Sequence, residues 1–569
     1  MKHVKRLFAE LRRRRVFRVA AMYAVVAWML MQIGEVTFPA LRLPDWTLTL
    51  VVVLLIGGFP IAMILAWAFD VTSAGVVRTD AADRPEQAVT RKSDAPGIEA
   101  ADSLPALDPA GIAVLPFQNM SPDPDNEYFS DGIAEDLILR LCKTGGLRVI
   151  SRTSAWQYKQ TPAGARQIGS ELGVAYLVEG SVRRIANNVR IAAQLIDVRS
   201  DQHIWAETYD RELEDIFAIQ SDVAQRIAGA LSVTLTGVES ATGRESSITT
   251  DLEAYDLYLR GRYHWNRRTP KDLEECVVLF QGAIDRDPCC VPAHAALAEA
   301  YVTLAIYGLR PAADVLPLAR AEAKEALRQE PGQASALSAL ACVHAIFDWE
   351  WDQAAAAFEQ VIRDNPLYPT APLWFAMNVH LPLGRFEEAV GQLERAATVD
   401  PLSPTVEASL GVVAFMRGDF AEAYSRFEAV TARDNRLAFA HYYQGLSAQY
   451  MGDAGQALEA LDRARAAGGW SAENQAALGG ALAAAGREAE ARDVLAAMTE
   501  GRENHYVSPV RIAQLHAALG ENESALDRLD EAVEVRAADL IWVDVFPAFK
   551  AVRQLPRYEV IRARVFDTQ

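Results

Sequence analysis

A glycine followed five residues later by an alanine recurs at a fixed step of 34 residues through the C-terminal half of this chain. The glycines are Gly384, Gly418, Gly452, Gly486 and Gly520, and the alanines are Ala389, Ala423, Ala457, Ala491 and Ala525. Four residues after each alanine stands a large apolar residue, namely Leu393, Phe427, Leu461, Leu495 or Leu529. This period predicts a stack of similar helical units, each of which buries its apolar face against its neighbours.

A period of 34 residues is that of the tetratricopeptide repeat, a pair of antiparallel helices. Gly411, Gly445 and Gly479 stand where the first helix of a repeat packs closely against its partner, and Pro366 and Pro401 stand where a second helix ends. We predict about eight repeats within 251–539. Residues 540–569 depart from the pattern and are predicted to cap the last apolar face.

Partner binding by such arrays uses an inner groove formed by the first helix of each repeat. The groove positions predicted to contact a partner hold Trp374, Asn378, Phe415, Met416, Phe439, Tyr442, Leu446 and Tyr450. As a set they form an aromatic stripe across three repeats, which favours binding of an apolar protein segment. The alternative for each single residue is ordinary packing in the core.

The N-terminal region is basic and then apolar. Residues 1–15 form a basic head, which is typical of a terminus that faces a membrane. Residues 16–70 contain two apolar stretches, for which we predict a transmembrane helical hairpin that contacts the lipid bilayer. The alternative is that only the second stretch spans, which would place the rest of the chain in the periplasm. Residues 71–108 are polar and are predicted to form a linker.

Residues 109–236 show short apolar runs alternating with amphipathic segments, in the order β-α-β-α-β-β-β-α. This order predicts an α/β sandwich domain with a mixed sheet. Four motifs, which begin at Ile112, Glu127, Leu177 and His203, resemble the TolB-amino-terminal-like (FlgO-like) domain. The resemblance implies a bacterial membrane protein in which this domain accompanies tetratricopeptide repeats, at times beside an adenylate-cyclase domain. It brings no catalytic residue set with it.

Asp131, Glu135 and Asp136 invite an acid/base or metal-site interpretation of the α/β domain. The simpler interpretation is that they lie in the first turn of a helix, where acidic residues offset the positive end of the dipole. The chain has no GxxxxGK[ST], GxSxG or HExxH motif. We therefore predict no catalytic, cofactor-binding or metal-binding residues. The net charge of −19 argues against general binding of nucleic acid.

The fold class predicted is therefore multidomain: a transmembrane helical hairpin, an α/β sandwich domain with a mixed sheet, and an all-α tetratricopeptide-repeat solenoid. The predicted function is a non-enzymatic scaffold at the bacterial inner membrane, with its soluble domains in the cytoplasm, that recruits protein partners through the repeat groove. The α/β domain is predicted to have a sensing or an assembly role. Whether it binds a small-molecule ligand is left open by the sequence. The alternative function is an adenylate-cyclase-related or nucleotide-linked enzyme acting through residues 110–235.

Overall fold

The computed structural model describes residues 107–143, 146–159, 161, 163–235, 249, 251–500 and 505–567, together with 69–72, 75–78, Leu55 and Phe59. The chain divides into two units, Met1–Ala100 and Ala101–Gln569. In the first unit, β1 (Phe69–Thr72) and β2 (Gly75–Arg78) form an antiparallel pair. These strands lie where the sequence analysis predicted the end of the hairpin and the start of a linker, and the two boundaries stay predictions.

The predicted fold class is wrong in its transmembrane part. Among the residues that the structure describes, no helix is long and apolar enough to cross a membrane. The basic head and residues 16–68 lie outside the described residues, apart from Leu55 and Phe59. The fold is mostly helical, with a repeat solenoid and one small domain that contains a mixed sheet. Lipid contact and inner-membrane localisation stay predictions from the sequence.

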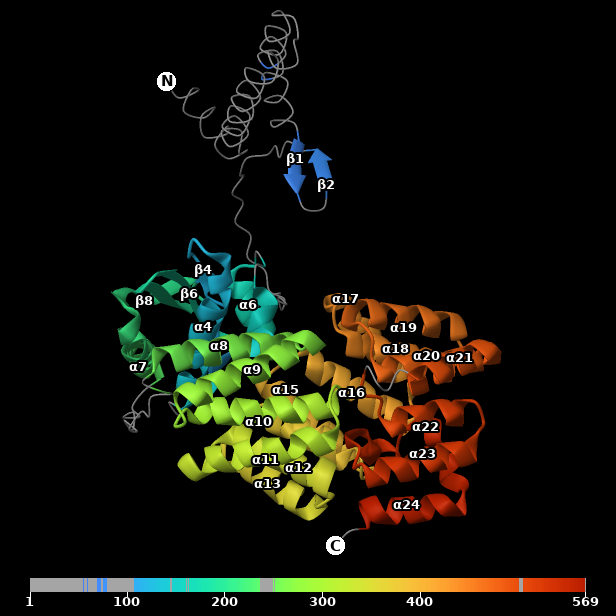
Figure 1. The fold of residues 1–569 in the computed structure, drawn as a ribbon. Coiled ribbons are helices and arrows are strands. Elements are labelled where there is room, and N and C mark those ends of the chain that lie inside the picture. Colours follow the sequence, from blue (N-terminus) through green and yellow to red (C-terminus); the bar gives the residue numbers. More distant parts are fainter. Residues whose placement is uncertain are drawn as a thin grey trace, which may run out of the picture. The chain divides into compact units, whose positions relative to one another are not determined.

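The small domain opens the second unit with the predicted order of elements (Figure 1). The strands lie in the order β5-β3-β6-β7-β8, and β4 also pairs with β6. β3 runs parallel to β5 and β6, whereas β6, β7 and β8 are antiparallel, so the sheet is mixed. The elements are β3 (Asp108–Val114), β4 (Gln118–Asn119), α4 (Glu127–Lys143), β5 (Arg148–Val149), α5 (Arg152–Ala155), α6 (Ala165–Leu172), β6 (Val174–Ile185), β7 (Asn188–Asp197), β8 (Gln202–Glu212) and α7 (Ile216–Leu235).

The solenoid contains eight helix pairs among the described residues, as the 34-residue period predicts. Its elements are α8 (Leu252–Arg267), α9 (Pro270–Arg286), α10 (Val291–Ile306), α11 (Ala312–Gln329), α12 (Ala334–Val343), η4 (His344–Asp348), α13 (Trp351–Asp364), α14 (Thr370–Phe375), η5 (Ala376–His380), α15 (Phe386–Val399), α16 (Pro404–Arg417), α17 (Phe420–Arg433), α18 (Ala438–Tyr450), α19 (Ala454–Gly468), α20 (Ala472–Ala484), α21 (Glu488–Glu500), α22 (Pro509–Ala518) and α23 (Asn522–Glu534).

The recurring glycines and alanines have a direct structural cause. The five glycines from Gly384 to Gly520 all have φ between 68° and 97°, the left-handed conformation in which the first helix of a repeat ends. The five alanines are fully buried in the second helix. At Gly411, an added Cβ would lie 2.8 Å from the ring of Phe427, so glycine there permits close contact between α16 and α17.

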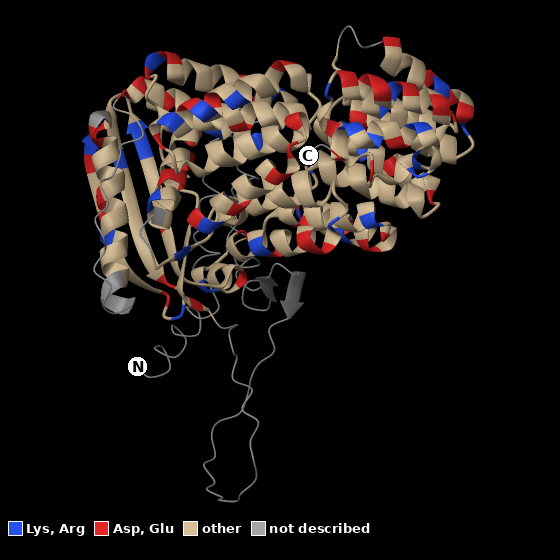
Figure 2. Ribbon diagram, turned by 90° about the horizontal axis from the view of Figure 1, so that it is seen from below, with Lys and Arg blue, Asp and Glu red and all other residues tan. Residues whose placement is uncertain are grey.

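Acidic and basic residues are interspersed along the outer faces of the solenoid helices (Figure 2). Arg426, for example, pairs with Glu422 at 3.0 Å and with Glu407 at 2.9 Å. Exposed pairs of this kind contribute about 0–1 kcal/mol each. The stability of the array therefore comes mainly from its buried apolar faces.

The α/β domain and the first repeats share one hydrophobic core. This core joins the sheet residues Val114 and Ile191 with Tyr255, Leu259 and Phe280 of α8 and α9. An added Cβ at Gly132 of α4 would lie 2.7 Å from a methyl group of Leu259, which shows how closely α4 approaches α8. The two regions were predicted as separate domains, but in the structure the sheet domain and the solenoid are packed together.

The C-terminal segment, residues 538–566, returns along the solenoid instead of covering only its last repeat. It comprises η7 (Ala538–Trp542), η8 (Pro547–Phe549), η9 (Val552–Gln554) and α24 (Pro556–Phe566). The indole of Trp542 donates to the carbonyl of Met377 at 3.0 Å, and that of Trp351 donates to the carbonyl of Val565 at 3.0 Å. The prediction of a simple end cap is therefore corrected, because this segment also contacts earlier repeats, at η5 through Met377 and at α13 through Trp351.

Candidate partner-binding groove

The side chains predicted to form an exposed stripe lie mostly in the core. Six of them are buried: Trp374, Asn378, Phe415, Met416, Tyr442 and Leu446. Phe439 is 36% exposed, and Tyr450 is partly buried. The prediction of an exposed aromatic stripe is therefore corrected, while partner binding by this part of the solenoid stays a prediction.

The physical reason for this burial is contact with the C-terminal segment and with neighbouring repeats. The ring of Phe415 lies 5.7 Å from that of Phe546, and 5.5 Å and 5.6 Å from those of Tyr443 and Tyr450. Aromatic rings at these distances and inclined to one another make favourable edge contacts. The positions that face the groove in an open array are thus covered here by the protein's own chain.

An open cavity remains further along the solenoid. It has a volume of about 650 Å³ and lies between the first helices of three consecutive repeats, α18, α20 and α22, and the C-terminal segment. Two residues of the predicted stripe, Leu446 and Tyr450, line it at one side. This cavity, which we call the inner groove, lies in the size range of about 300–1,000 Å³ that is typical of ligand pockets.

The floor of the inner groove is formed by short side chains of α20. Ala476, Ala477, Gly480, Ala483 and Ala484 all line it, and the opposite wall carries Ala548 and Ala551. Because none of these side chains extends beyond a Cβ, they leave the space beside α20 unfilled. The groove therefore presents an apolar surface to which another chain can approach closely.

Polar groups are set into this apolar surface. Gln449, Gln514 and Gln554 line the groove, as does Lys550. The side-chain oxygen of Gln449 is buried and has no hydrogen-bond partner, whereas that of Gln514 accepts a bond of 3.2 Å from Arg511. An amide side chain can donate and accept, as a peptide backbone does. The groove can therefore bind a backbone through amides and a carboxylate through Lys550.

A buried ion cluster fixes the walls of the groove. Arg511 of α22 pairs with Glu473 of α20 at 3.1 Å and with Asp539 of η7 at 2.9 Å. Burial acts to lower the pKa of Arg511, but the negative charge of Glu473, followed by interactions with Tyr442 and Asp539, outweighs it and raises the pKa. The guanidinium therefore stays charged and ties α20, α22 and the C-terminal segment together.

Asp131, Glu135 and Asp136 do not occupy the first turn of their helix, as the sequence analysis proposed, because α4 already begins at Glu127. Asp131 instead accepts from Lys159 at 2.7 Å, and Glu135 pairs with Arg262 of α8 at 2.5 Å. Asp136 accepts from Tyr255 and, at 3.1 Å, from Gln220. All three face other elements of the fold, so the capping interpretation is wrong. Glu135 and Asp136 instead join the α/β domain to α8 of the solenoid, and Asp131 holds Lys159 within the α/β domain.

The sequence contains a signal for the inner groove. The first helix of the repeat at 472–484 contains eight alanines or glycines in thirteen residues, more than α16 or α18. Large apolar side chains on a first helix were interpreted as binding residues, but they are what a core buries most readily. A run of small residues at groove positions is the better indicator of an open surface.

Two family models match separate parts of the chain. The model of the HilA/YgeH-like transcriptional regulator, second domain, matches residues 109–227, and a tetratricopeptide-repeat model matches residues 378–436. The second match confirms the repeats. The first gives the α/β domain a different family description from the one proposed from the sequence, and the resemblance to the TolB-amino-terminal-like domain is not supported.

Curated relatives match only in part. A protein named "Putative adenylate cyclase 3" from Rhizobium meliloti (strain 1021) is 47% identical over 209 residues, which cover 36% of this chain and 35% of that protein. The transcriptional regulator HilA of Salmonella typhimurium is 22% identical over 292 residues, which cover 51% of each chain. The chain thus spans about a third to a half of the length of these relatives.

Solved tetratricopeptide-repeat structures resemble parts of the solenoid. The type IV pilus biogenesis factor PilW is 20% identical, with a TM-score of 0.31, and the match covers 40% of this chain and 98% of that one. YrrB, described as a repeat protein with an unusual peptide-binding site, is 22% identical, with a TM-score of 0.23 and coverage of 34% and 95%.

Proposed function

We propose that this protein is a non-enzymatic scaffold that binds an extended segment of a protein partner in the inner groove. Tetratricopeptide repeats mediate protein interactions, and the chain contains such repeats. The observation that carries the finer proposal is the open groove itself, with an apolar floor on α20 and amide side chains along its walls. The partner segment has small apolar side chains, because the floor has no deep pocket for large ones, and a carboxylate that pairs with Lys550.

An extended segment fits the groove better than a helix does. The polar lining consists of three glutamines spread over α18, α22 and the C-terminal segment, so their amides can pair with exposed backbone groups of an extended chain. A helix has no such free groups in its interior, since its own hydrogen bonds use them. It is also about 10–12 Å wide with its side chains, which is broad for a groove of this volume.

The test combines crosslinking with variants that fill the groove. A photo-crosslinking amino acid at Ala484, which is exposed at the rim, identifies the partner and the bound segment in cells. A synthetic peptide of that segment is then titrated against purified protein. We expect Ala483→Leu and Lys550→Glu each to weaken binding by tenfold or more. The matched control is Ala466→Leu, the same substitution on the outer helix α19 outside the groove, and it should leave the affinity unchanged.

Equal binding by Ala483→Leu and Ala466→Leu would refute the assignment of the groove. Substitutions at Trp374 or Tyr442 do not serve this purpose, because both side chains are buried and their removal would disturb folding. Far-UV circular dichroism of each variant shows whether its fold is retained.

The α/β domain has an assembly role in this proposal, because Glu135 on α4 holds the solenoid through its buried ion pair with Arg262 of α8. A small-molecule ligand for this domain is the sensing alternative, and a thermal-shift screen against nucleotides and metabolites tests it. Under the assembly role, a ligand that raises the melting temperature of the protein should do so only if that ligand also changes the binding of the partner peptide in the inner groove.

A nucleotide-linked enzyme is the second candidate, favoured by the 47% identity to the Rhizobium meliloti protein over part of its length. The scaffold proposal expects no turnover of ATP or GTP by the purified chain. Turnover that is lost in Asp131→Ala, in a variant that still folds, would reject the non-enzymatic proposal and assign chemistry to the α/β domain.

A further inference from the structure

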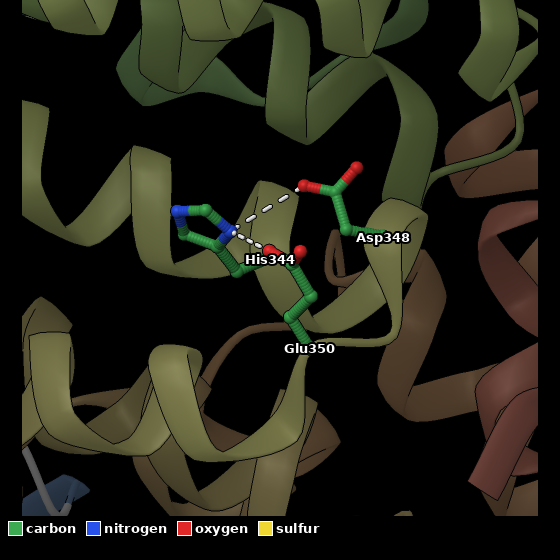
Figure 3. Close-up of side chains that lie close together, drawn as sticks. All are labelled: His344, Asp348 and Glu350. Atoms are coloured by element: carbon green, nitrogen blue, oxygen red, sulfur yellow. Dashed lines mark hydrogen bonds and ion pairs between the residues drawn. The ribbon is translucent and has the colours of Figure 1, made fainter. Parts of the chain in front are cut away.

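One turn of the solenoid departs from the repeat pattern and brings three potential metal ligands together. Between α12 and α13, the single π-helical turn η4 begins at His344 and ends at Asp348, and Glu350 precedes α13 (Figure 3). Trp349, between them, has a φ of 61°. It occupies the place that the left-handed glycine has in other repeats. Trp349 lies 35 residues before Gly384, one residue more than the usual step of 34. The next repeat also contains a π-helical turn, η5, so the left-handed residue with a large side chain is what sets this turn apart, and such residues occur more often at functional sites.

The last repeat shows what this turn looks like without the departure. There, His516 and Glu521 occupy the corresponding places, with Gly520 as the left-handed residue. In both turns the backbone N–H of the glutamate donates to the carbonyl of the histidine at 2.9 Å, and the histidine Nδ1 lies 2.7 Å from a carboxylate oxygen of that glutamate. The turn at His344 contains one more residue, and Asp348 adds a second carboxylate.

The three ligand atoms converge on one point. Nδ1 of His344 lies 2.7 Å from Oε2 of Glu350 and 3.4 Å from Oδ2 of Asp348, and all three atoms lie within 4.8 Å of one another. Zinc binds imidazole nitrogen and carboxylate oxygen at about 2.0–2.2 Å, so tetrahedral ligands are separated by about 3–3.5 Å. Small side-chain movements would therefore place all three atoms around one ion.

The surroundings fit an ion that enters from solvent. The Glu350 side chain is 44% exposed, whereas His344 and Asp348 are 21% and 17% exposed, so the cluster is open on one side. Arg320 donates to both oxygens of Asp348 at 2.6 Å. Hydrogen bonds of this kind orient a carboxylate that binds a metal. With His344 in the neutral form that binds a metal, two carboxylates and one guanidinium leave a net negative charge for a cation to offset.

We propose that His344, Asp348 and Glu350 bind one divalent first-row transition metal ion, for which zinc is the best fit, with the remaining coordination position open to water. One imidazole nitrogen and two carboxylate oxygens form a donor set that zinc accepts, and three protein ligands with one open position are typical of accessible zinc sites. Among the described residues, this is the cluster in which three such groups meet. The ion would link α12 to α13 and stabilise the turn.

The experiment is a zinc titration of the full-length, tag-free chain after chelator treatment, with a chromogenic chelator as competitor. We expect one equivalent of zinc to bind, and affinity to fall by tenfold or more in both His344→Gln and Glu350→Gln. The matched control is His516→Gln, which removes the same kind of histidine from a turn that has a single carboxylate. It should retain the wild-type affinity.

Binding by wild type that is no tighter than binding by His344→Gln would overturn the proposal and show an ion-pair cluster only. An equal loss of zinc affinity in His516→Gln would overturn the proposal as well. The effect of removing a histidine would then not depend on the second carboxylate that only the turn at His344 has. If His344→Gln fails to fold, Glu350→Gln decides the matter, because its exposed side chain makes folding insensitive to the change. None of these outcomes depends on the partner or on the inner groove.

Discussion

The interface between the α/β domain and the solenoid depends on Arg262, and we predict a large loss of stability when its charge is removed. The guanidinium of Arg262 lies 2.5 Å from an oxygen of Glu135 on α4 and 3.4 Å from an oxygen of Glu299 on α10. The side chains of Glu135 and Glu299 are only 13% and 3% exposed. One cation therefore serves two carboxylates that water does not reach well.

The expected cost follows from what remains after the substitution Arg262→Met, which keeps the length of the stem but removes the charge. Glu135 keeps Arg152 at 3.3 Å, whereas Glu299 keeps only the hydroxyl of Tyr368 at 2.6 Å. Leaving a buried charge without its partner costs about 3–5 kcal/mol. The matched control is Arg310→Met, which breaks an exposed pair with Glu274 at 2.8 Å and should cost less than about 1 kcal/mol.

The measurement is urea unfolding at neutral pH, followed by tryptophan fluorescence, for the wild type and both variants. Burial acts to raise the pKa of Glu135, but the charges of Arg262 and Arg152 outweigh it, and the pKa lies below its usual value. A carboxylate with a lowered pKa stabilises the fold above its unfolded pKa and loses that contribution as the pH falls through the folded pKa. Neutral pH is therefore where the effect of Arg262→Met should be largest.

Equal unfolding midpoints for Arg262→Met and Arg310→Met would refute the reasoning, since the buried network would then contribute no more than a surface pair. The double variant Arg262→Met with Glu299→Gln provides a second check. This variant removes the charge of Glu299 as well as that of Arg262, so no unpaired charge stays buried. It should therefore recover part of the stability lost in Arg262→Met.

Two further predictions concern other buried positions. Burial raises the pKa of Asp136 to about 6, so the folded state binds more protons than the unfolded state between about pH 4 and pH 6, and the stability that depends on this group falls as the pH rises through that range. Asp136→Asn should therefore gain stability relative to the wild type as the pH is raised from about 4 to 6. The free energy of unfolding of both proteins is measured by urea unfolding at each pH. A difference between the two proteins that stays constant over this range would contradict the prediction. Gly411→Ala should lower the free energy of unfolding by about 1–3 kcal/mol, because its Cβ would meet Phe427 at 2.8 Å. Gly391→Ala, in α15 with nothing within 4 Å, should instead raise it by about 0.4–1 kcal/mol, and a change of the same sign in both variants would refute the packing argument.

The solenoid could be predicted because its information is local and repeated. Each recurring glycine ends a helix through its own φ, and each recurring alanine fits one contact between adjacent helices, so a single repeat specifies its own shape. The order of elements in the α/β domain was predictable for a similar reason, since each strand has its own apolar run. The placement of Asp131 in the first turn of its helix was wrong, because α4 already begins at Glu127 and the segment from Glu127 to Ser130 carries no strong helix signal of its own.

The burial of the aromatic stripe could not be predicted in this way. It depends on a contact between Phe415 and Phe546, which are far apart in the sequence and belong to a repeating and a non-repeating segment. No period relates the C-terminal segment to the helices on which it packs. The partners of Glu135 were equally hidden, because Arg262 lies in a different region of the chain and its position is set only when the sheet domain meets α8.

The repeat pattern also explains where function is best sought in this chain. Positions that follow the pattern are accounted for by folding: Gly411 by close packing and Ala423 by burial. Positions that depart from it at a cost need another cause. At η4, an inserted residue and a left-handed Trp349 replace the usual glycine, although a non-glycine residue in that conformation costs about 1–2 kcal/mol. Burial of the Trp349 indole offsets part of that cost, but it does not account for Asp348, the carboxylate that the turn at His516 lacks. The proposed ion accounts for Asp348 and the insertion together, since both are needed to add the third ligand.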